Sequence, residues 1–232
     1  MDKNQEQKYS IGVILLAAGS SSRMNGDDKI FIPIFENPLL FYSLTEFHRS
    51  PLINSITIVL NEKNLDKGTE YIKSLNLPKV KSICKGGLRR QDSVLNGLNT
   101  LGEHDYILIH DAARPCIDQS VIERGIETVI ANNAAIPIIP STDTLRTLSE
   151  DNYSDNIIDR QKVWATQTPQ CFSYTIILRA LTKNNKTVTD EAILVQKLGV
   201  KVKTFLGSKT NIKITTEDDI PFIKSILKGK IT

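Results

Sequence analysis

The sequence has little cysteine, histidine or tryptophan: three cysteines, three histidines and one tryptophan among 232 residues. The cysteines, Cys84, Cys116 and Cys171, stand far apart and form no C-x-x-C pair. That spacing indicates neither a disulfide framework nor a zinc site. We read all three as reduced, partly buried, small apolar residues.

An excess of charge of one sign is also missing, because the net charge is only +3 and the two signs are interspersed. Without a basic stripe or interleaved aromatics, we expect no nucleic-acid partner. The apolar run at residues 13–16 is too short to span a membrane. The first eight residues are polar and lack the apolar core of a signal peptide. These absences predict a cytoplasmic protein with no membrane partner.

What is present is an ordinary globular composition, 40% hydrophobic and 24% charged, long enough for one large α/β domain or two small ones. Strand patterns occur at residues 13–16, 55–60, 80–84, 106–109 and 134–140, and helix patterns at 38–49, 63–75, 89–101 and 120–131. Their alternation predicts an α/β fold with a mainly parallel sheet and helices on both faces. The two prolines at 137 and 140 place the end of the fifth strand at a sheet edge or exit.

The alternation breaks after residue 140. Short segments at 143–148 and 156–160 flank a polar turn and predict a β-hairpin arm over about 141–163. A two-stranded hairpin is marginal alone, so we expect it to pack on a second copy of the chain; a floppy insertion is the alternative. Helices at 174–181 and 189–197, a strand at 200–206, an extended piece at 211–215 and a capping box at 216–219 follow. With no convincing linker, residues 1–232 are predicted to form a single domain.

Small side chains at residues 17–22 follow the first strand, and Arg23 and Lys29 come just after them. Small residues let backbone N–H groups approach a ligand closely, and Gly19 can adopt a positive φ. The pattern is typical of a phosphate-binding loop, although an ordinary loop with solvated charges is the alternative. Polar loops also leave the strands at residues 84 and 109, and ligands bind beyond the carboxyl ends of such strands. We expect the three loops to share one crevice.

Seven blocks follow one another along the chain: 17–19 with Arg23, Met24 and Lys29; 86–87 with 92–94; 110–115; 159–160 with Trp164; 167–170; 189–192; and 211–213. In order and spacing, from residue 11 to about 227, they resemble the 2-C-methyl-D-erythritol 4-phosphate cytidylyltransferase family of the non-mevalonate isoprenoid pathway. The resemblance implies a Rossmann-like nucleotidyltransferase fold, of the nucleotide-diphospho-sugar transferase type, and a homodimer joined through the arm. It implies that CTP and the sugar-alcohol phosphate give 4-diphosphocytidyl-2-C-methyl-D-erythritol and pyrophosphate. Mg²⁺ or another divalent cation would be bound mainly through the CTP phosphates, with no metal ligand assigned on the chain.

The resemblance also implies roles for individual residues. Arg23 and Lys29 match cations that stabilise charge on the triphosphate, and Arg160 and Lys213 match those that position the attacking phosphate. The nucleotide pocket is matched by Ala17, Ala18, Gly19, Gly87, Ser93 and Ala112. The surroundings of the erythritol phosphate are matched by Asp111, Arg114, Thr144, Thr168 and Thr189, with Thr144 and Arg160 reaching into the neighbouring subunit's site.

Three positions depart from the family pattern. Asp28 and Ile30 replace the proline and glutamine that often flank the loop lysine, and Leu88 stands where an acidic residue often contacts the nucleotide. These departures leave the predicted fold unchanged and concern only the contacts to the nucleotide. The chemistry itself suits the chain, because an ionised phosphate needs no side-chain nucleophile, only cations and N–H groups placed beforehand.

Two other functions remain open. Ribitol 5-phosphate cytidylyltransferase would share the fold and mechanism; Ala113, the spacing from Asp159 to Trp164 and Glu191 favour methylerythritol instead. A non-catalytic nucleotide-binding protein could dispense with the four cations, and all four are present. We read His110 as structural and Trp164 as a packing anchor for the arm.

Overall fold

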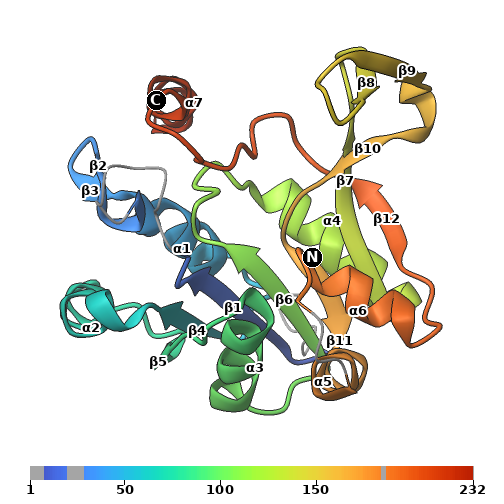
Figure 1. The fold of residues 1–232 in the computed structure, drawn as a ribbon. Coiled ribbons are helices and arrows are strands. Elements are labelled where there is room, and N and C mark those ends of the chain that lie inside the picture. The colour runs from blue at the N-terminus through green and yellow to red at the C-terminus, as the bar shows by residue number, and fades with distance from the viewer. Residues whose placement is uncertain (1–7, 20–28, 184–186, 232) are drawn as a thin grey trace, which may run out of the picture.

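The structure is a computed structural model that describes residues 8–19, 29–183 and 187–231. Within these ranges eight strands form one sheet. Seven follow the order β10-β7-β11-β6-β1-β4-β5, and the eighth, β12, also pairs with β7 (Figure 1). The strands are β1 (Ile11–Ala17), β4 (Ser55–Leu60), β5 (Val80–Lys85), β6 (Tyr106–Asp111), β7 (Ala134–Pro140), β10 (Trp164–Thr166), β11 (Gln170–Ser173) and β12 (Lys203–Leu206).

The sheet is mostly parallel, as predicted. β1 pairs in parallel with β4 and β6, β5 continues beside β4, and β12 runs parallel to β7. The exceptions are β10 and β11, which run antiparallel to their neighbours and which the sequence did not predict. At Pro140 the chain leaves the sheet for the arm, in agreement with the two prolines of β7.

Helices cover both faces of the sheet (Figure 1). In β1, Val13 and Leu15 point to one buried layer and Ile14 to the other, because side chains alternate along a strand. The first layer contains α1 (Leu39–Arg49), α2 (Leu65–Ser74) and α4 (Gln119–Asn132). The second contains α3 (Arg90–Leu101), α5 (Tyr174–Lys183) and α6 (Glu191–Lys197). The alternation read from the sequence is therefore confirmed.

Smaller elements lie at the rim. The helix α7 (Asp219–Ile231) packs over the hairpin of β2 (Pro33–Ile34) and β3 (Asn37–Pro38) through a separate apolar cluster that includes Ile34 and Ile223. Short turns of 3-10 helix occur at η1 (Lys29–Phe31), η2 (Glu62–Asn64) and η3 (Arg160–Lys162). Residues 211–215, expected to be extended, lie outside any strand, and the Ile214 N–H donates to the Ala113 carbonyl at 2.9 Å.

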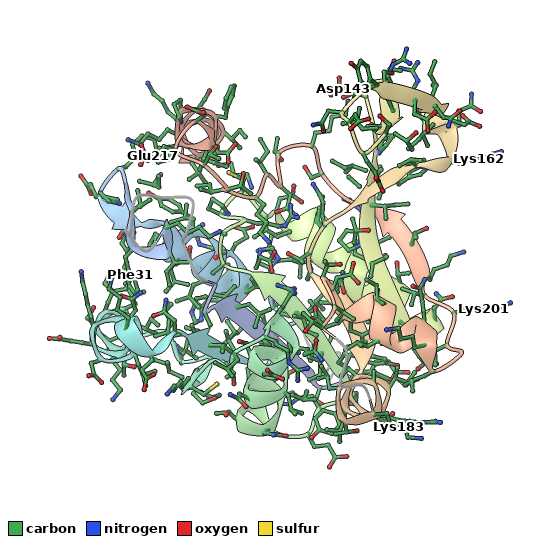
Figure 2. The ribbon with its side chains drawn as sticks, in the orientation of Figure 1. Phe31, Asp143, Lys162, Lys183, Lys201 and Glu217 are labelled. Carbon is green, nitrogen blue, oxygen red and sulfur yellow. The ribbon has the colours of Figure 1, made fainter. Side chains whose placement is uncertain are left out.

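The predicted arm is present as β8 (Leu145–Leu148) and β9 (Ser154–Ile158), an antiparallel pair separate from the main sheet. It projects from the body, and Figure 2 shows its side chains between the labelled Asp143 and Lys162 pointing into open space. Leu148, Tyr153 and Ile157 are each more than 60% exposed. The arm therefore offers an apolar surface that nothing in its own chain covers among the described residues.

The cysteines are free, with Cys84 half-buried and Cys116 and Cys171 buried, as expected from their spacing. Over the part of the chain that the structure describes, no helix is both long enough and apolar enough to cross a membrane.

Candidate active site

A cleft of about 550 Å³ opens at the carboxyl ends of β1, β5 and β6. It is lined by backbone and side chains from the three loops that the sequence led us to expect together: Leu16, Ala17, Ala18, Gly19, Lys29, Ile30, Gly87, Leu88, Arg89, Arg90, Ser93, Asp111, Ala113 and Lys213. The predicted convergence on one crevice is confirmed.

Strand register brings these loops together. In the parallel pair β1–β6, Leu16 lies opposite Asp111, and in β1–β4, Ala17 lies opposite Leu60. The Gly86 N–H donates to the Leu60 carbonyl at 2.7 Å, which fastens the loop after β5 to the same edge. Because parallel strands end at one edge of a sheet, their loops meet there.

Close packing shapes the nucleotide side of the cleft. The Ser93 hydroxyl accepts the Gly87 N–H at 3.1 Å and donates to the Arg89 carbonyl at 3.2 Å. A Cβ added to Gly87 would lie 2.3 Å from the Asp92 Cβ, so no larger residue fits without movement. Leu88, the departure from the family pattern, extends its side chain fully into solvent beside this loop.

The first loop is described only in part. Its Lys29 lines the cleft and donates from Nζ to the Ile214 carbonyl at 3.3 Å, which links the loop to the segment before α7. Ile30 is buried at the cleft wall. Arg23 and Asp28 lie outside the described residues.

Ala112 and its neighbour Ala113 differ in what they reach. The Ala112 N–H donates to the Leu16 carbonyl at 2.9 Å, and its side chain is buried in the core behind the cleft. Ala113, one residue further on, lines the cleft. The side chain of Ala112, predicted to belong to the nucleotide pocket, therefore lies behind the cleft wall and does not face the cleft.

Asp111 ends β6 with its carboxylate surrounded by cations. One oxygen accepts from Arg90 Nη1, and the other lies 2.8 Å from Lys213 Nζ and 4.0 Å from Arg114 Nε. Burial alone raises the pKa of Asp111, but the charges of Arg90 and Lys213 outweigh it and hold that pKa well below its usual range. Asp111 is therefore an ionised anchor for cations and is unsuited to act as a general base near neutral pH.

Arg90 was not among the predicted site residues. Besides Asp111, it binds Glu191, whose Oε2 lies 3.1 Å from Arg90 Nη2. Glu191 is fully buried, and burial raises its pKa despite the charge of Arg90. The sequence offers only a weak signal that Arg90 belongs to the site. Arg90 follows the paired glycines of a strand-end loop, but so does its neighbour Arg89.

Thr168 and Arg114 do not line the cleft, but they join the segments that carry Asp111 and Lys213. The Thr168 hydroxyl accepts the Asp111 N–H at 3.2 Å, and its carbonyl accepts from Asn211 Nδ2 at 2.8 Å. Arg114 Nη1 donates to the Asn211 carbonyl at 2.8 Å. His110 is fully buried beside them with its ring against Phe47, which agrees with the structural role we expected for it.

Three predicted residues lie elsewhere. Thr189 is exposed just before α6, whose N-cap is Asp190. Thr144 and Arg160 are exposed on the arm, where Arg160 Nη1 donates to the Thr142 carbonyl at 3.3 Å. Among the described residues, none of these three lines the cleft of its own chain.

No group of three or more His, Cys, Asp and Glu side chains able to hold a metal ion occurs in residues 8–19, 29–183 and 187–231. The carboxylate that lines the described cleft is Asp111, and cations already occupy it. This donor set fits a divalent cation that enters on a triphosphate, because Mg²⁺ commonly takes substrate phosphates and water as ligands.

Comparison with known proteins agrees with this geometry. The model of the 2-C-methyl-D-erythritol 4-phosphate cytidylyltransferase family matches residues 11–229. Proteins of that name from Dehalococcoides mccartyi and Clostridium acetobutylicum are 41% and 40% identical to the chain, over 94% and 93% of it and 96% of each relative. The crystal structure of 4-diphosphocytidyl-2C-methyl-D-erythritol synthase from Anaerococcus prevotii superposes with a TM-score of 0.83 at 28% identity, covering 94% of this chain and 96% of that one. The Thermus thermophilus 2-C-methyl-D-erythritol 4-phosphate cytidylyltransferase gives 0.78 at 26% identity, covering 93% and 98%.

Proposed function

The chain belongs to the 2-C-methyl-D-erythritol 4-phosphate cytidylyltransferase family, and we propose that the cleft at the carboxyl ends of β1, β5 and β6 is its catalytic site. The enzyme is a nucleotidyltransferase that converts CTP and 2-C-methyl-D-erythritol 4-phosphate into 4-diphosphocytidyl-2-C-methyl-D-erythritol and pyrophosphate. The observation that carries the assignment to this cleft is the meeting of Lys29 and Lys213 with the small-residue loop of β1.

The proposed step needs no side-chain nucleophile. A phosphate oxygen of the sugar phosphate attacks the α-phosphorus of CTP in line, the new P–O bond forms, and the bond to pyrophosphate breaks. Lys29, with Arg23, stabilises the charge that gathers on the triphosphate, and Lys213, with Arg160, holds the incoming phosphate. Preorganised cations and backbone N–H groups lower such a barrier because they are in place before the charge develops.

Asp111 has a supporting part in this mechanism. Its carboxylate stays ionised and fixes Lys213 at 2.8 Å, so the ammonium is already oriented when the second anion enters. Ala17, Ala18, Gly19, Gly87 and Ser93 form the nucleotide side, with Ala112 behind them. Arg114, Thr168 and Thr189 lie outside the cleft lining, and we assign them to the sugar-phosphate side through their places next to Asp111, Lys213 and α6. When bound, Mg²⁺ or another divalent cation would add further neutralisation of the triphosphate charge.

We further propose that the enzyme is a cytoplasmic homodimer joined through the arm, each chain acting as one domain. The exposed apolar side chains Leu148, Tyr153 and Ile157 support this, because a two-stranded hairpin needs a surface to pack on. Thr144 and Arg160 would then complete the partner's sugar-phosphate site. That arrangement accounts for their distance from the cleft of their own chain.

The experiment that tests the function is a product assay. The purified protein is incubated with CTP, Mg²⁺ and either methylerythritol phosphate or ribitol 5-phosphate, and the diphosphocytidyl product and pyrophosphate are measured. We expect methylerythritol phosphate to be strongly preferred, since the small side chain of Ala113 and the buried Glu191 are as the resemblance requires. A clear preference for ribitol phosphate would reassign the substrate. Binding of CTP without product from either sugar would support the non-catalytic alternative.

A further inference from the structure

Arg90 connects three elements that are distant in sequence. It belongs to the first turn of α3, whose N-terminal loop forms the nucleotide side of the cleft. Yet its guanidinium reaches Asp111 at the end of β6 through Nη1 and Glu191 at the start of α6 through Nη2. The two carboxylates lie 21 and 101 residues from it along the chain.

The bridge that Arg90 makes is largely withdrawn from water. Side-chain exposure is 24% for Arg90, 9% for Asp111 and zero for Glu191. Glu191 Oε1 and Arg90 Nε are buried without a hydrogen-bond partner, so the bridge depends on the two contacts made by Arg90 Nη1 and Nη2. Burying such a pair brings little net stability, whereas removal of one partner leaves an uncompensated charge inside the protein. The bridge is therefore better suited to fixing geometry than to stabilising the fold.

Both contacts of Arg90 lead to the sugar-phosphate side. Asp111 uses its other oxygen to hold Lys213 Nζ at 2.8 Å. Glu191 is the first residue of α6, two positions after Thr189. By sharing the negative charge of Asp111, Arg90 keeps Lys213 from being fully neutralised, so that its ammonium can still attract an incoming anion.

We propose that Arg90 is a positioning residue for the sugar phosphate: it orients Asp111, and through it Lys213, and it fixes the N-terminus of α6 beside them. The proposal rests on the function proposed above. A direct role as a triphosphate ligand is the rival explanation. In that case both Nη atoms would have to leave their carboxylates. Among the described residues, Lys213 is the other cation within such a short distance of Asp111, and Glu191 has none besides Arg90.

The test compares Arg90→Met, Arg90→Lys and the matched control Arg124→Met in the full-length enzyme. Arg124 lies on α4 outside the cleft lining, where its half-buried side chain donates from Nε to the Leu206 carbonyl. For Arg90→Met we expect the KM for the sugar phosphate to rise about tenfold or more, the range of a lost charged hydrogen bond, with the KM for CTP changed much less. Arg90→Lys keeps the charge but reaches one carboxylate, so it should recover part of the loss. Arg124→Met should match the wild type in both constants.

Two results would overturn the proposal: an unchanged KM for the sugar phosphate in Arg90→Met, or a larger loss for CTP than for the sugar phosphate, which would make Arg90 a triphosphate ligand. Near-ultraviolet circular dichroism confirms that each variant is folded. If Arg90→Met does not fold, Arg90→Lys carries the same comparison. Failure of the proposed function is separable, because the wild-type enzyme would then form no product with either sugar.

Discussion

His110 Nδ1 lies 3.0 Å from the Thr168 hydroxyl oxygen, and that same oxygen lies 3.2 Å from the Asp111 amide nitrogen. The other ring nitrogen of His110, Nε2, lies 3.2 Å from the Arg114 carbonyl oxygen. A carbonyl oxygen can only accept a hydrogen bond. Neutral His110 therefore donates from Nε2 and accepts at Nδ1. The Thr168 hydroxyl must then donate to His110 while it accepts the Asp111 N–H, so its one hydrogen is committed to holding the end of β6.

The first prediction concerns Thr168→Val, which keeps the shape of the side chain but removes the hydroxyl. The His110 Nδ1 acceptor and the Asp111 N–H would both be left buried without a partner. We expect the free energy of unfolding to fall by about 1–3 kcal/mol. Urea unfolding measures this, with Thr168→Ser as the matched control because it restores the hydroxyl. Equal stability of Thr168→Val and the wild type would contradict the arrangement.

The second prediction follows from the burial of His110, which lowers the pKa of its imidazole to about 3. Below about pH 6.5 the unfolded chain takes up a proton at this residue and the folded chain does not. Since the unfolded state then binds more protons, stability falls as the pH falls, by at most about 1.4 kcal/mol per unit. Asp111 also lowers stability as the pH falls, but at more acidic pH. Because its pKa is depressed in the folded state, its stabilisation is lost only below its ordinary pKa near 4.

Between about pH 6.5 and 4.5 the lowered pKa of His48 and the raised pKa of Glu191 also affect stability, so the contribution of His110 is isolated by comparison with a variant that lacks it. Urea unfolding across that window should show a shallower decline for His110→Asn than for the wild type, even if the variant is less stable at neutral pH. Parallel declines for the two proteins would show that His110 is already able to titrate in the folded state.

The spacing of apolar residues in the sequence predicts the parallel strands β1, β4, β5 and β6, because each of them is a local apolar run. It does not predict β10 and β11. These strands are three and four residues long, and their antiparallel direction is set by pairing with β6 and β7, far away in the chain. Direction of this kind depends on tertiary packing and leaves no local signal.

The site shows the same division. Loops at the strand ends, and hence the cleft, could be predicted from topology. Arg90 could not, because Arg89 and Arg90 are identical in type and adjacent. Only the fold shows that Arg89 pairs locally with Asp92 while Arg90 turns inward to Asp111 and Glu191.

The third prediction is that Lys29→Ala lowers kcat by several hundredfold, about 2.7–4 kcal/mol, by analogy with the loss of one preorganised charge-stabilising donor. The lysine lines the cleft and is held near Ile214 by its hydrogen bond. Steady-state assays at saturating CTP and sugar phosphate measure the effect. Lys81→Ala, an exposed lysine on β5, serves as the control. Near-normal turnover of Lys29→Ala would remove this residue from the catalytic role.

The fourth prediction concerns the arm surface. Ile157 is 63% exposed on β9, so Ile157→Asp should leave the fold of the chain unchanged. If the arm packs on a second copy, a buried unpaired carboxylate would there oppose association. We expect the wild type to be a dimer and the variant a monomer by light scattering. The control Asn156→Asp introduces the same aspartate at the neighbouring exposed position, and this variant should stay dimeric. A monomeric wild type would argue against the proposed dimer itself.

The last prediction separates an arm that acts in its own chain from one that acts in the partner's. Lys29→Ala disables the body of a chain and Arg160→Ala disables its arm, so each homodimer alone should be nearly inactive. In a mixed dimer whose arms reach across, the Arg160→Ala chain supplies a body with intact Lys29, and the Lys29→Ala chain supplies the arm with intact Arg160. One of the two sites is then complete. Random mixing then restores about a quarter of wild-type activity, because half of the dimers are mixed and each has one working site of two.

If the arm served its own chain, every site in the mixture would carry one defect and no activity would return. Subunit exchange is followed by differently tagged chains, so a failure to mix is distinguished from a failure to complement. The position of Arg160 on an exposed arm, bound there to the Thr142 carbonyl rather than to any residue of the described cleft, leads us to expect recovery.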